Sequence, residues 1–212
     1  MKEIYALGIG HATPVFIELA ETCGYRIVGL YHYNDSRNGE MDHGYKIFGS
    51  FNDLYHDDIK GKSFMLTMGD MNIKKAVSIK LLQKGAILPT IIHPTANISR
   101  FANISECGVL INSLCEIGPD SIISDGCVLW PRATVSHDCH VSNYVFIGPN
   151  AYIGAYTKLG EAAFIGQCSM LVSDKVKIVG NNALIGAGSL VTKPVPDNTI
   201  VAGHPAKELR HR

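Results

Sequence analysis

A histidine followed directly by an aspartate, His137-Asp138, is the pair in this sequence best suited to move protons at neutral pH. A carboxylate that holds one imidazole nitrogen leaves the other nitrogen free to take a proton, so the pair can act as a general base toward an amine or a hydroxyl group. A second histidine, His140, follows three residues later. The alternative is that both histidines are solvated turn residues without a chemical role.

Metal binding is a second possibility for the same segment. His137 and His140 would supply two ligands, and Asp138 or a neighbouring subunit would have to supply the third. The paired histidine spacing of solenoid carbonic anhydrases of the gamma type is not present. We therefore expect no metal.

A regular pattern of aliphatic residues surrounds this segment. From Ile117 to Leu171 an aliphatic side chain recurs at every sixth position, mostly followed by Gly or Ser. This period predicts a β-solenoid, and if three hexads make one coil, residues 18 apart stack on each other. The count slips by two after Leu171 and stops at Pro194 and Pro196. Before Ile117 the pattern includes three further residues: Ile98, Ile104 and Leu110.

The six cysteines do not indicate zinc or disulfide chemistry. They contain no C-x-x-C pair, and Cys115, Cys127 and Cys139 are spaced by twelve residues, which places them on different walls of such a solenoid. We expect free thiols, buried or partly exposed.

The first ninety residues predict a small α/β domain. Residues 3–7 read as a strand that leads through Gly8-Ile9-Gly10-His11 into a helix, with Thr13 as its cap, and a second strand follows at 26–31. A glycine-rich turn at a helix start can hold a phosphate through backbone N–H groups and the helix dipole. The G-x-G-x-x-G fingerprint is incomplete because Thr13 stands at its third glycine, so an ordinary strand-to-helix turn is the alternative.

The rest of this domain continues the same alternation. A strand at 64–68 ends in the loop from Gly69 to Asn72, a helix runs from about Ile73 to Lys84, and residues 87–88 read as a short strand. The polar stretch 34–42 is expected to be an exposed loop.

Charge and hydropathy exclude some classes of protein. Lys+Arg and Asp+Glu number 19 each among 212 residues, so no net charge favours nucleic acid or an anionic membrane. The longest apolar runs fall well short of the roughly 20 residues that span a bilayer. The start Met1-Lys2-Glu3-Ile4-Tyr5 leads into a strand rather than a signal sequence, so we expect a cytoplasmic protein.

Motifs along nearly the whole chain together resemble one family. They are the turn Gly8-Ile9-Gly10-His11, the junction Ile92-His93-Pro94-Thr95-Ala96, the hexads, His137-Asp138-Cys139 and the ending Ala202-Gly203-His204-Pro205-Ala206-Lys207. This combination resembles the bacterial sialic-acid O-acetyltransferase-like family of hexapeptide-repeat acyltransferases, nearest to the N-acetyltransferases of nucleotide-linked 4-amino-4,6-dideoxy sugars.

The resemblance implies an architecture and an assembly. Residues 1–90 would form a nucleotide-sugar-binding α/β domain with a small Rossmann-like parallel sheet. Residues 91–212 would form a left-handed parallel β-helix with a C-terminal tail. The family also implies a homotrimer with active sites between subunits.

The resemblance further implies roles for residues of the β-helix. His137 would be the general base and Asp138 its partner, and acetyl-CoA would be the co-substrate, attacked directly by the acceptor amine. The backbone N–H of Ala155 would hold the oxyanion, and the pantetheine arm would pass Gln167 and Ala187.

Two positions depart from the family pattern by being aromatic. Phe146 stands where the family often has a histidine that lies by the acetyl-CoA, and Trp130 stands where it often has an asparagine near the acceptor. Either both pack into the wall or the trimer seam, or they form an apolar platform for a sugar face or an acyl group.

For the first domain, the resemblance implies that the turn holds the pyrophosphate of the nucleotide sugar, although a cap or turn contact is the alternative for His11. The usual acidic pair after the second strand falls on His32-Tyr33, with Asp35 just beyond. The expected substrate-binding residues of this domain are Gly8, Gly10, His11, His32, Tyr33, Asp35, Gly49, Gly69 and Asn72.

The predicted function is therefore acetyl-CoA-dependent N-acetylation of the 4-amino group of a nucleotide-linked amino-deoxy sugar. The choice among UDP, dTDP and GDP stays open. One alternative is O-acetylation of a sugar or sialic acid. Alternatives of another class are a non-catalytic nucleotide-sugar-binding protein and a metal-dependent solenoid trimer.

Overall fold

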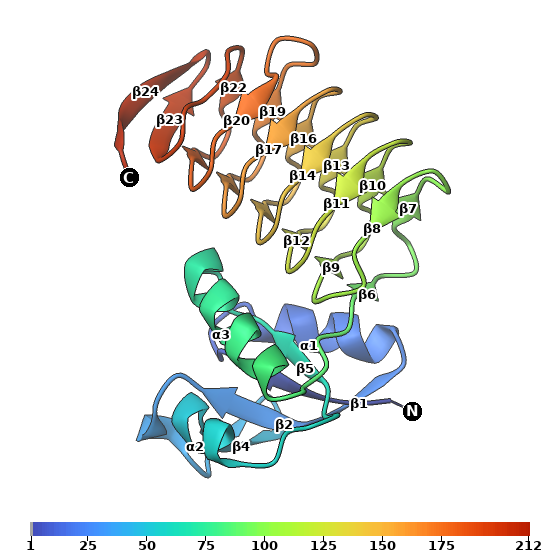
Figure 1. Cartoon of the computed structure of the whole chain (residues 1–212), viewed down its shortest axis with the longest axis vertical. Coiled ribbons are helices and arrows are strands. Elements are labelled where there is room, and N and C mark those ends of the chain that lie inside the picture. Colours follow the sequence, from blue (N-terminus) through green and yellow to red (C-terminus); the bar gives the residue numbers. More distant parts are fainter. Residues whose placement is uncertain (1) are drawn as a thin grey trace. The chain divides into compact units, whose positions relative to one another are not determined.

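The computed structural model describes residues 2–212, which form two compact units (Figure 1). The first unit ends at Ile91 and the second begins at Ile92. The first unit is an α/β domain and the second is a parallel β-solenoid. Each has its own core.

The first unit is built on a five-stranded sheet in the order β3-β4-β2-β1-β5. Strands β1, β2, β4 and β5 run parallel, and the short β3 pairs antiparallel with β4. The sheet strands are β1 Lys2–Leu7, β2 Tyr25–His32, β3 Met41–Asp42, β4 Tyr45–Ser50 and β5 Phe64–Leu66. The helices are α1 Thr13–Thr22, the 3₁₀ helix Asp35–Arg37, α2 Phe51–His56 and α3 Met71–Gln83.

The start of α1 differs from the prediction. Ala12 is the N-cap residue, and its side chain makes no capping hydrogen bond. Thr13 lies one position inside the helix, where its Oγ1 accepts a hydrogen bond from Gly10 N–H at 2.9 Å and lies 3.2 Å from Thr67 Oγ1. The prediction of Thr13 as the cap was wrong because its buried hydroxyl links the turn to Thr67 instead.

Two other segments of the first unit also differ. The sequence did not predict β3, β4 and α2, and part of the expected loop at 34–42 forms the 3₁₀ helix and β3. The strand expected at 87–88 is reduced to one isolated bridge between Ser63 and Ile87. A single bridge fixes the path of the chain there without making a sixth strand.

The solenoid has three walls, and the strands within each wall pair parallel, apart from the last strand of wall C, which is antiparallel. Wall A contains β7 Asn97–Ile98, β10 Glu116–Ile117, β13 Thr134–Val135, β16 Tyr152–Ile153, β19 Met170–Leu171 and β22 Leu190–Val191. Wall B contains β8 Asn103–Ile104, β11 Ile122–Ile123, β14 His140–Val141, β17 Lys158–Leu159 and β20 Ile178–Val179. Wall C contains β6 Ile91–Ile92, β9 Leu110–Ile111, β12 Val128–Leu129, β15 Phe146–Ile147, β18 Phe164–Ile165, β21 Leu184–Ile185, β23 Thr199–Gly203 and β24 Ala206–His211.

The register of the walls follows the hexads. Val135 pairs with Ile153, 18 residues on, as three hexads per coil predict. After Leu171 the spacing widens, so that Leu159 pairs with Val179. The inward residue of β9 is Ile111 rather than Leu110, because Leu129 stacks on Ile111 and the extra residue lies in the turn before β9. The prediction of Leu110 as the core position was therefore wrong.

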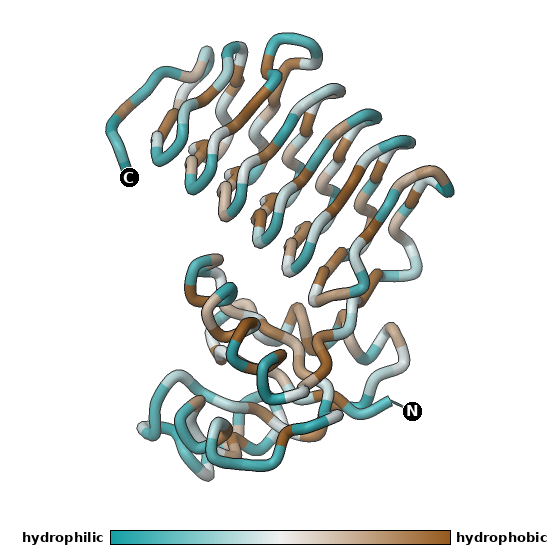
Figure 2. Tube along the Cα trace, viewed as in Figure 1, coloured by the Kyte–Doolittle hydropathy of each residue, from teal (hydrophilic) through white to brown (hydrophobic). Residues whose placement is uncertain are grey.

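The solenoid core is a column of buried aliphatic side chains. The Cα tube of Figure 2 is correspondingly brown, the colour of hydrophobic residues, at intervals along the coils. Cys115, Cys127 and Cys139 belong to this column, and they precede strands of walls A, C and B respectively. All six cysteines are free thiols, as predicted. The last two strands, β23 and β24, form an antiparallel hairpin that ends the solenoid.

Candidate active site

The predicted catalytic pair lies at the corner of the solenoid between walls A and B, in the turn from β13 to β14. His137 Nδ1 is 2.7 Å from Asp138 Oδ2, and both side chains are about half exposed, at 45% each. Asp138 adopts the left-handed conformation, with φ 55°. This backbone turn directs the carboxylate back toward the imidazole, so neighbouring residues can face each other.

A tyrosine of the next coil packs against the imidazole, and a lysine of the coil after that packs against the tyrosine. The ring of Tyr156 meets the His137 ring edge to face, with centroids 5.2 Å apart and planes at 90°. Lys177 Nζ lies 5.3 Å from the centroid of the Tyr156 ring and pairs with Asp174 at 2.7 Å. The sequence prediction missed Tyr156, although it stands 18 residues after Asp138 and the coil period would have placed it there.

Ala155 lies directly above His137 in this corner. Its backbone N–H, the predicted oxyanion donor, donates a hydrogen bond to Ser173 Oγ at 3.0 Å, and only 4% of Ala155 is exposed. The N–H therefore already has an acceptor within the chain.

Four other predicted residues meet at wall C. Phe146, Trp130, Gln167 and Ala187 line one cavity of about 270 Å³, together with Phe164 and the backbone of three glycines. The Phe146 and Phe164 rings are stacked, with centroids 4.4 Å apart and planes at 2°, and Trp130 lies 6.1 Å from Phe146. The described residues that line the cavity include no charged side chain. This surface suits a neutral, largely apolar group.

These two groups of residues occupy different corners of the same solenoid. His137 and Ala155 lie between walls A and B, whereas Trp130, Gln167 and Ala187 follow strands of wall C and lie between walls C and A. Wall A separates the two corners within one chain. Within one chain, the structure therefore places His137 next to Ala155, and Trp130 next to Gln167 and Ala187. It does not place the first group next to the second.

In the first unit, Gly8 and Tyr33 lie at the carboxyl ends of β1 and β2. Gly8 has φ 89°, and a side chain there would come within 2.9 Å of Met68 and 3.2 Å of the Tyr33 hydroxyl. Partial burial and the nearby Asp70 carboxylate raise the pKa of Tyr33. Three strand ends thus meet at the edge where ligands bind open α/β sheets.

The helix N-termini at this edge are partly satisfied by the chain itself. Gly10 N–H donates to Thr13 Oγ1, while Asn72 N–H and Ile73 N–H donate to Asp70 Oδ1. A carboxylate at the start of α3 opposes a bound phosphate, so the start of α1 is the better candidate for pyrophosphate. Of the predicted residues there, His11 and Gly10 are exposed, as is Gly69 before α3.

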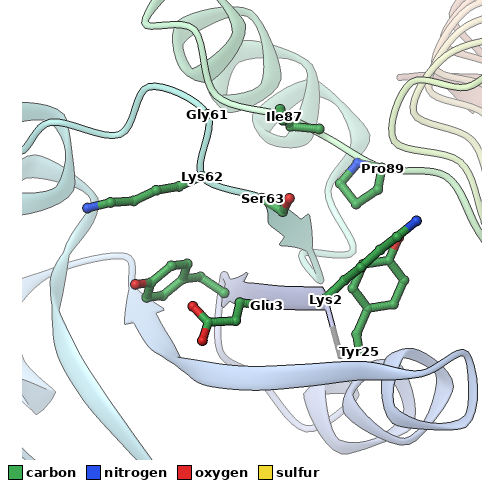
Figure 3. A pocket seen from close by; sticks show the side chains of 9 residues that line it. Lys2, Glu3, Tyr25, Gly61, Lys62, Ser63, Ile87 and Pro89 are labelled. Atoms are coloured by element: carbon green, nitrogen blue, oxygen red, sulfur yellow. The ribbon is translucent and has the colours of Figure 1, made fainter.

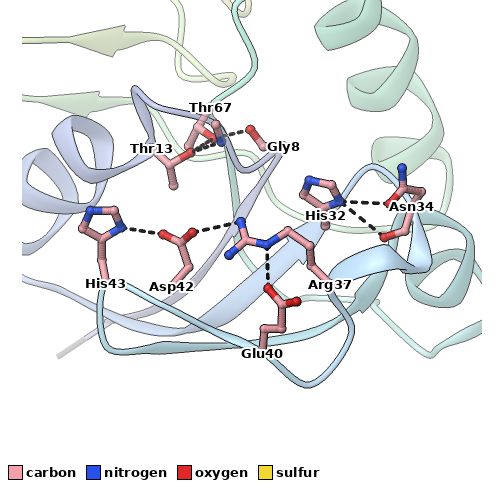
Figure 4. Close-up of polar contacts among 10 residues, drawn as sticks. Gly8, Thr13, His32, Asn34, Arg37, Glu40, Asp42, His43 and Thr67 are labelled. Atoms are coloured by element: carbon pink, nitrogen blue, oxygen red, sulfur yellow. Dashed lines mark hydrogen bonds and ion pairs between the residues drawn. The ribbon is translucent and has the colours of Figure 1, made fainter.

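The segment after β2 is held by a polar network (Figure 4). His32 Nδ1 lies 3.3 Å from Asn34 Oδ1, which also caps the 3₁₀ helix that starts at the exposed Asp35. Arg37 and His43 both contact Asp42, at 3.0 and 2.5 Å. Burial alone would raise the pKa of Asp42, but these hydrogen bonds outweigh burial and lower it. Two carboxylates of this segment, Glu40 and Asp42, are therefore engaged with Arg37 of the same segment.

Gly49 lies in β4 next to the cap of α2. A side chain at Gly49 would come within 2.7 Å of Asp53 Oδ2. Asp53 accepts hydrogen bonds from Ser50 N–H at 2.8 Å and from Asn38 Nδ2 at 3.2 Å, and the Ser50 bonds lower its pKa. Gly49 thus leaves room for a capping box rather than for a ligand contact of its own.

A cavity of the first unit lies at the opposite edge of the sheet (Figure 3). It has a volume of about 560 Å³ and lies by the amino ends of β1, β2 and β5. Its lining residues are Lys2, Glu3, Tyr5, Tyr25, Gly61, Lys62, Ser63, Ile87 and Pro89. No predicted site residue lies among them.

No group of three or more His, Cys, Asp or Glu side chains in residues 2–212 is placed to hold a metal ion. No helix in the same range is long and apolar enough to cross a membrane.

Known structures resemble this chain from end to end, whereas no family model matches it. The acetyltransferase domain of PglB from Neisseria gonorrhoeae FA1090, in complex with acetyl coenzyme A, is 27% identical, with 98% of this chain and 99% of that chain covered and a TM-score of 0.87. PerB from Caulobacter crescentus, in complex with CoA and GDP-perosamine, is 25% identical, with 99% and 98% covered and a TM-score of 0.88.

A third similar structure extends the likeness of fold. WeeI from Acinetobacter baumannii AYE is 20% identical, with 99% and 100% covered and a TM-score of 0.84. The fold class predicted from the sequence, a small α/β domain followed by a left-handed parallel β-helix, is confirmed. The chain is built along its whole length as the hexapeptide-repeat sugar acetyltransferases are built, which confirms the resemblance that its sequence predicted.

Proposed function

We propose that this chain is an acyltransferase that moves the acetyl group of acetyl-CoA to the amino group of a nucleotide-linked amino-deoxy sugar. The observation that carries the proposal is the His137–Asp138 pair, held at 2.7 Å on an exposed corner of a chain whose whole length resembles acetyl-CoA-binding and GDP-perosamine-binding structures. The position of the amine on the sugar, the 4-position, comes from the sequence resemblance.

In this mechanism His137 acts as the general base. In the tautomer that the mechanism needs, Nδ1–H donates a hydrogen bond to Asp138, 2.7 Å away, and Nε2 carries the lone pair, directed away from the carboxylate. Nε2 takes one proton from the amine as the amine nitrogen attacks the thioester carbon. The C=O electron pair moves onto oxygen, and its return breaks the C–S bond. The sulfur leaves with the proton from His137, so the products are the N-acetyl sugar and free CoA thiol.

The substrates would bind at separate surfaces. The apolar cavity with Trp130, Phe146, Gln167 and Ala187 suits the pantetheine arm, which carries amides and methylene groups but no charge. The turn at Gly8, Gly10 and His11, with His32, Tyr33 and Asp35 on the next strand end, is the proposed site for the nucleotide. Because the base and the apolar cavity lie on different corners, we also propose a homotrimer in which two subunits complete each site.

Release of free thiol from acetyl-CoA tests the reaction class. We would offer UDP-, dTDP- and GDP-linked 4-amino sugars, with the matching 4-hydroxy sugars as controls. Amine-dependent release supports the proposal and identifies the nucleotide. Release with the 4-hydroxy sugars would favour O-acetylation, and silence across the panel would favour a binding role.

Substitution of His137 tests its role. His137→Ala should reduce turnover by about two to four orders of magnitude, as general bases typically contribute, while acetyl-CoA binding persists. Asp138→Asn should cost less, and asparagine tolerates the left-handed backbone at this position. His140→Ala is the matched control, because His140 lies in β14 on wall B. Turnover retained in His137→Ala, or lost in His140→Ala, would contradict the assignment.

A further inference from the structure

The two-residue slip in the hexads after Leu171 enlarges one turn of the solenoid. The enlarged turn, residues 172–177, connects β19 to β20 at the corner between walls A and B. That corner also holds His137 and Ala155, one coil apart. The irregularity in the repeat therefore falls directly over the proposed catalytic pair.

We infer that the hydroxyl group of Ser173, in this enlarged turn, is the hydrogen-bond donor that holds the thioester oxygen during acetyl transfer. The Ala155 N–H would then polarise that hydroxyl from behind rather than touch the oxygen itself. The inference rests on the proposed acetyltransferase function and adds a catalytic residue to it.

The hydrogen bonding of Ala155 supports this assignment. Its N–H donates to Ser173 Oγ at 3.0 Å, its C=O accepts from Asp174 N–H at 3.4 Å, and the residue is buried. An incoming oxygen could reach this N–H only by displacing the serine. Ser173 itself is an exposed residue, and its hydroxyl stands between solvent and this buried N–H group.

The chemistry of a hydroxyl group suits the role. A hydroxyl oxygen that accepts a hydrogen bond keeps its own O–H to donate. The accepted and the donated hydrogen bond polarise each other, so each is stronger than it would be alone. As the amine attacks, the carbonyl oxygen gains the electron pair, and Ser173 O–H donates a hydrogen bond to it without giving up its proton. The proton of the amine still goes to His137, which then gives it to the departing sulfur of CoA.

The spacing of the coils is compatible with the step. Ser173 stands two coils above His137, but its Oγ lies 3.0 Å from the backbone nitrogen of Ala155, which is only one coil, about 4.8 Å, above His137. The path from His137 Nε2 through the amine nitrogen, the carbonyl carbon and its oxygen to Ser173 Oγ, with a hydrogen bond at each end, is about 8 Å along its bonds and fits this spacing.

The turn is also held firmly. A side chain on Gly154 would lie 2.5 Å from the Ser173 backbone nitrogen, so the coil below supports Ser173 in direct contact. The ion pair of Asp174 with Lys177, at 2.7 Å, closes the same turn. Ser173 is thus presented by a supported backbone, which a preorganised oxyanion donor requires.

Removal of the hydroxyl group distinguishes the two possible donors. If Ser173 holds the oxygen, Ser173→Ala should lower kcat and kcat/KM together by about 10²–10³-fold, as loss of one oxyanion donor typically does. If the Ala155 N–H holds the oxygen, the same change uncovers that N–H, and kcat should stay the same or rise. The second result would overturn the inference.

Further variants keep the test decisive. Ser173→Thr and Ser173→Val have the same shape and differ in the hydroxyl group, so only Thr should retain the rate; equal rates would overturn the inference even if Ser173→Ala fails to fold. Ser124→Ala, in the turn after β11, is the control and should leave turnover unchanged. If the wild-type protein releases no thiol, the proposed function itself is overturned. If the wild type is active and Ser173→Ala is equally active, only the inference about Ser173 is overturned.

Discussion

The imidazole of His137 is held from two directions, by a carboxylate at Nδ1 and by the edge-to-face ring of Tyr156. An exposed histidine has several rotamers of similar energy, and each contact reduces that freedom. Only one orientation leaves Nε2 available while Nδ1 faces Asp138. If His137 is the base, as proposed, Tyr156 is a positioning residue, which acts on the substrate only through His137.

The loss of the Tyr156 ring should slow the reaction without preventing acetyl-CoA binding. Aromatic pairs contribute about 0.5–1.5 kcal/mol, so Tyr156→Ala should lower kcat by up to about tenfold. Tyr156→Phe keeps the ring and should keep the rate. Alanine is compatible with the left-handed backbone here, because Ala162 has φ 56° at the equivalent place in the next turn. Steady-state kinetics that show a change in KM alone would argue against a positioning role.

At the scale of secondary-structure elements, the sequence predicted best where one side of each strand is buried at a fixed period. The hexads were predictable because every inward position of the walls is aliphatic. The error at β9 arose because Leu110 and Ile111 are both aliphatic and both buried, at 1% and 0% exposed, so hydropathy cannot say which one faces the core. Tyr156 and Ser173 come from neighbouring coils, and their contacts depend on register rather than on local pattern.

The short helix α2 was not predicted from hydrophobic periodicity, and a local cap fixes where it begins. Ser50 accepts from Asp53 N–H at 3.2 Å, and Asp53 accepts from Ser50 N–H at 2.8 Å, which closes a capping box. These bonds favour the ionised carboxylate, so the pKa of Asp53 lies below its ordinary value of 3.8. Its contribution to stability is present above that ordinary value and is lost as the pH falls through the lowered pKa.

Asp53→Asn should therefore destabilise the first unit at neutral pH, and by progressively less as the pH falls below 3.8 toward the lowered pKa of Asp53. Urea unfolding can be followed by the helical circular dichroism signal, since the described helices of residues 2–212 all lie in that unit. Ser50→Ala removes the other half of the box and should cost about 1 kcal/mol at neutral pH. A wild-type advantage over Asp53→Asn that does not shrink as the pH falls below 3.8 would contradict this account.

At the scale of the whole molecule, one chain carries the two proposed surfaces at separate corners of the solenoid. His137 lies at one corner and the apolar cavity at another, with wall A between them. Resemblance, rather than hexad counting, predicted the sharing of sites between subunits, because a repeat pattern describes one chain only. Light scattering in solution should give three times the chain mass of 23.0 kDa if the proposed trimer forms.

Mixed trimers provide a sharper test of shared sites. His137→Ala removes the base, and Ala187→Trp fills the apolar cavity. Each variant alone should be inactive. If each site takes one corner from each of two subunits, random reassembly of an equal mixture should restore about a quarter of the wild-type sites. Reassembled mixtures that stay inactive would mean that each chain supplies its whole site.

The stacking of His137, Ala155 and Ser173 on successive coils has a consequence for how such a protein can change. Strand spacing fixes each level at about 4.8 Å, so the distance between levels cannot be adjusted gradually. A different acceptor must be accommodated by exchanging the side chain at one level, by lengthening a turn, as in residues 172–177, or by inserting or deleting a complete coil. Selection can therefore change the side chains and turns that each coil presents, but it cannot change the distance between coils.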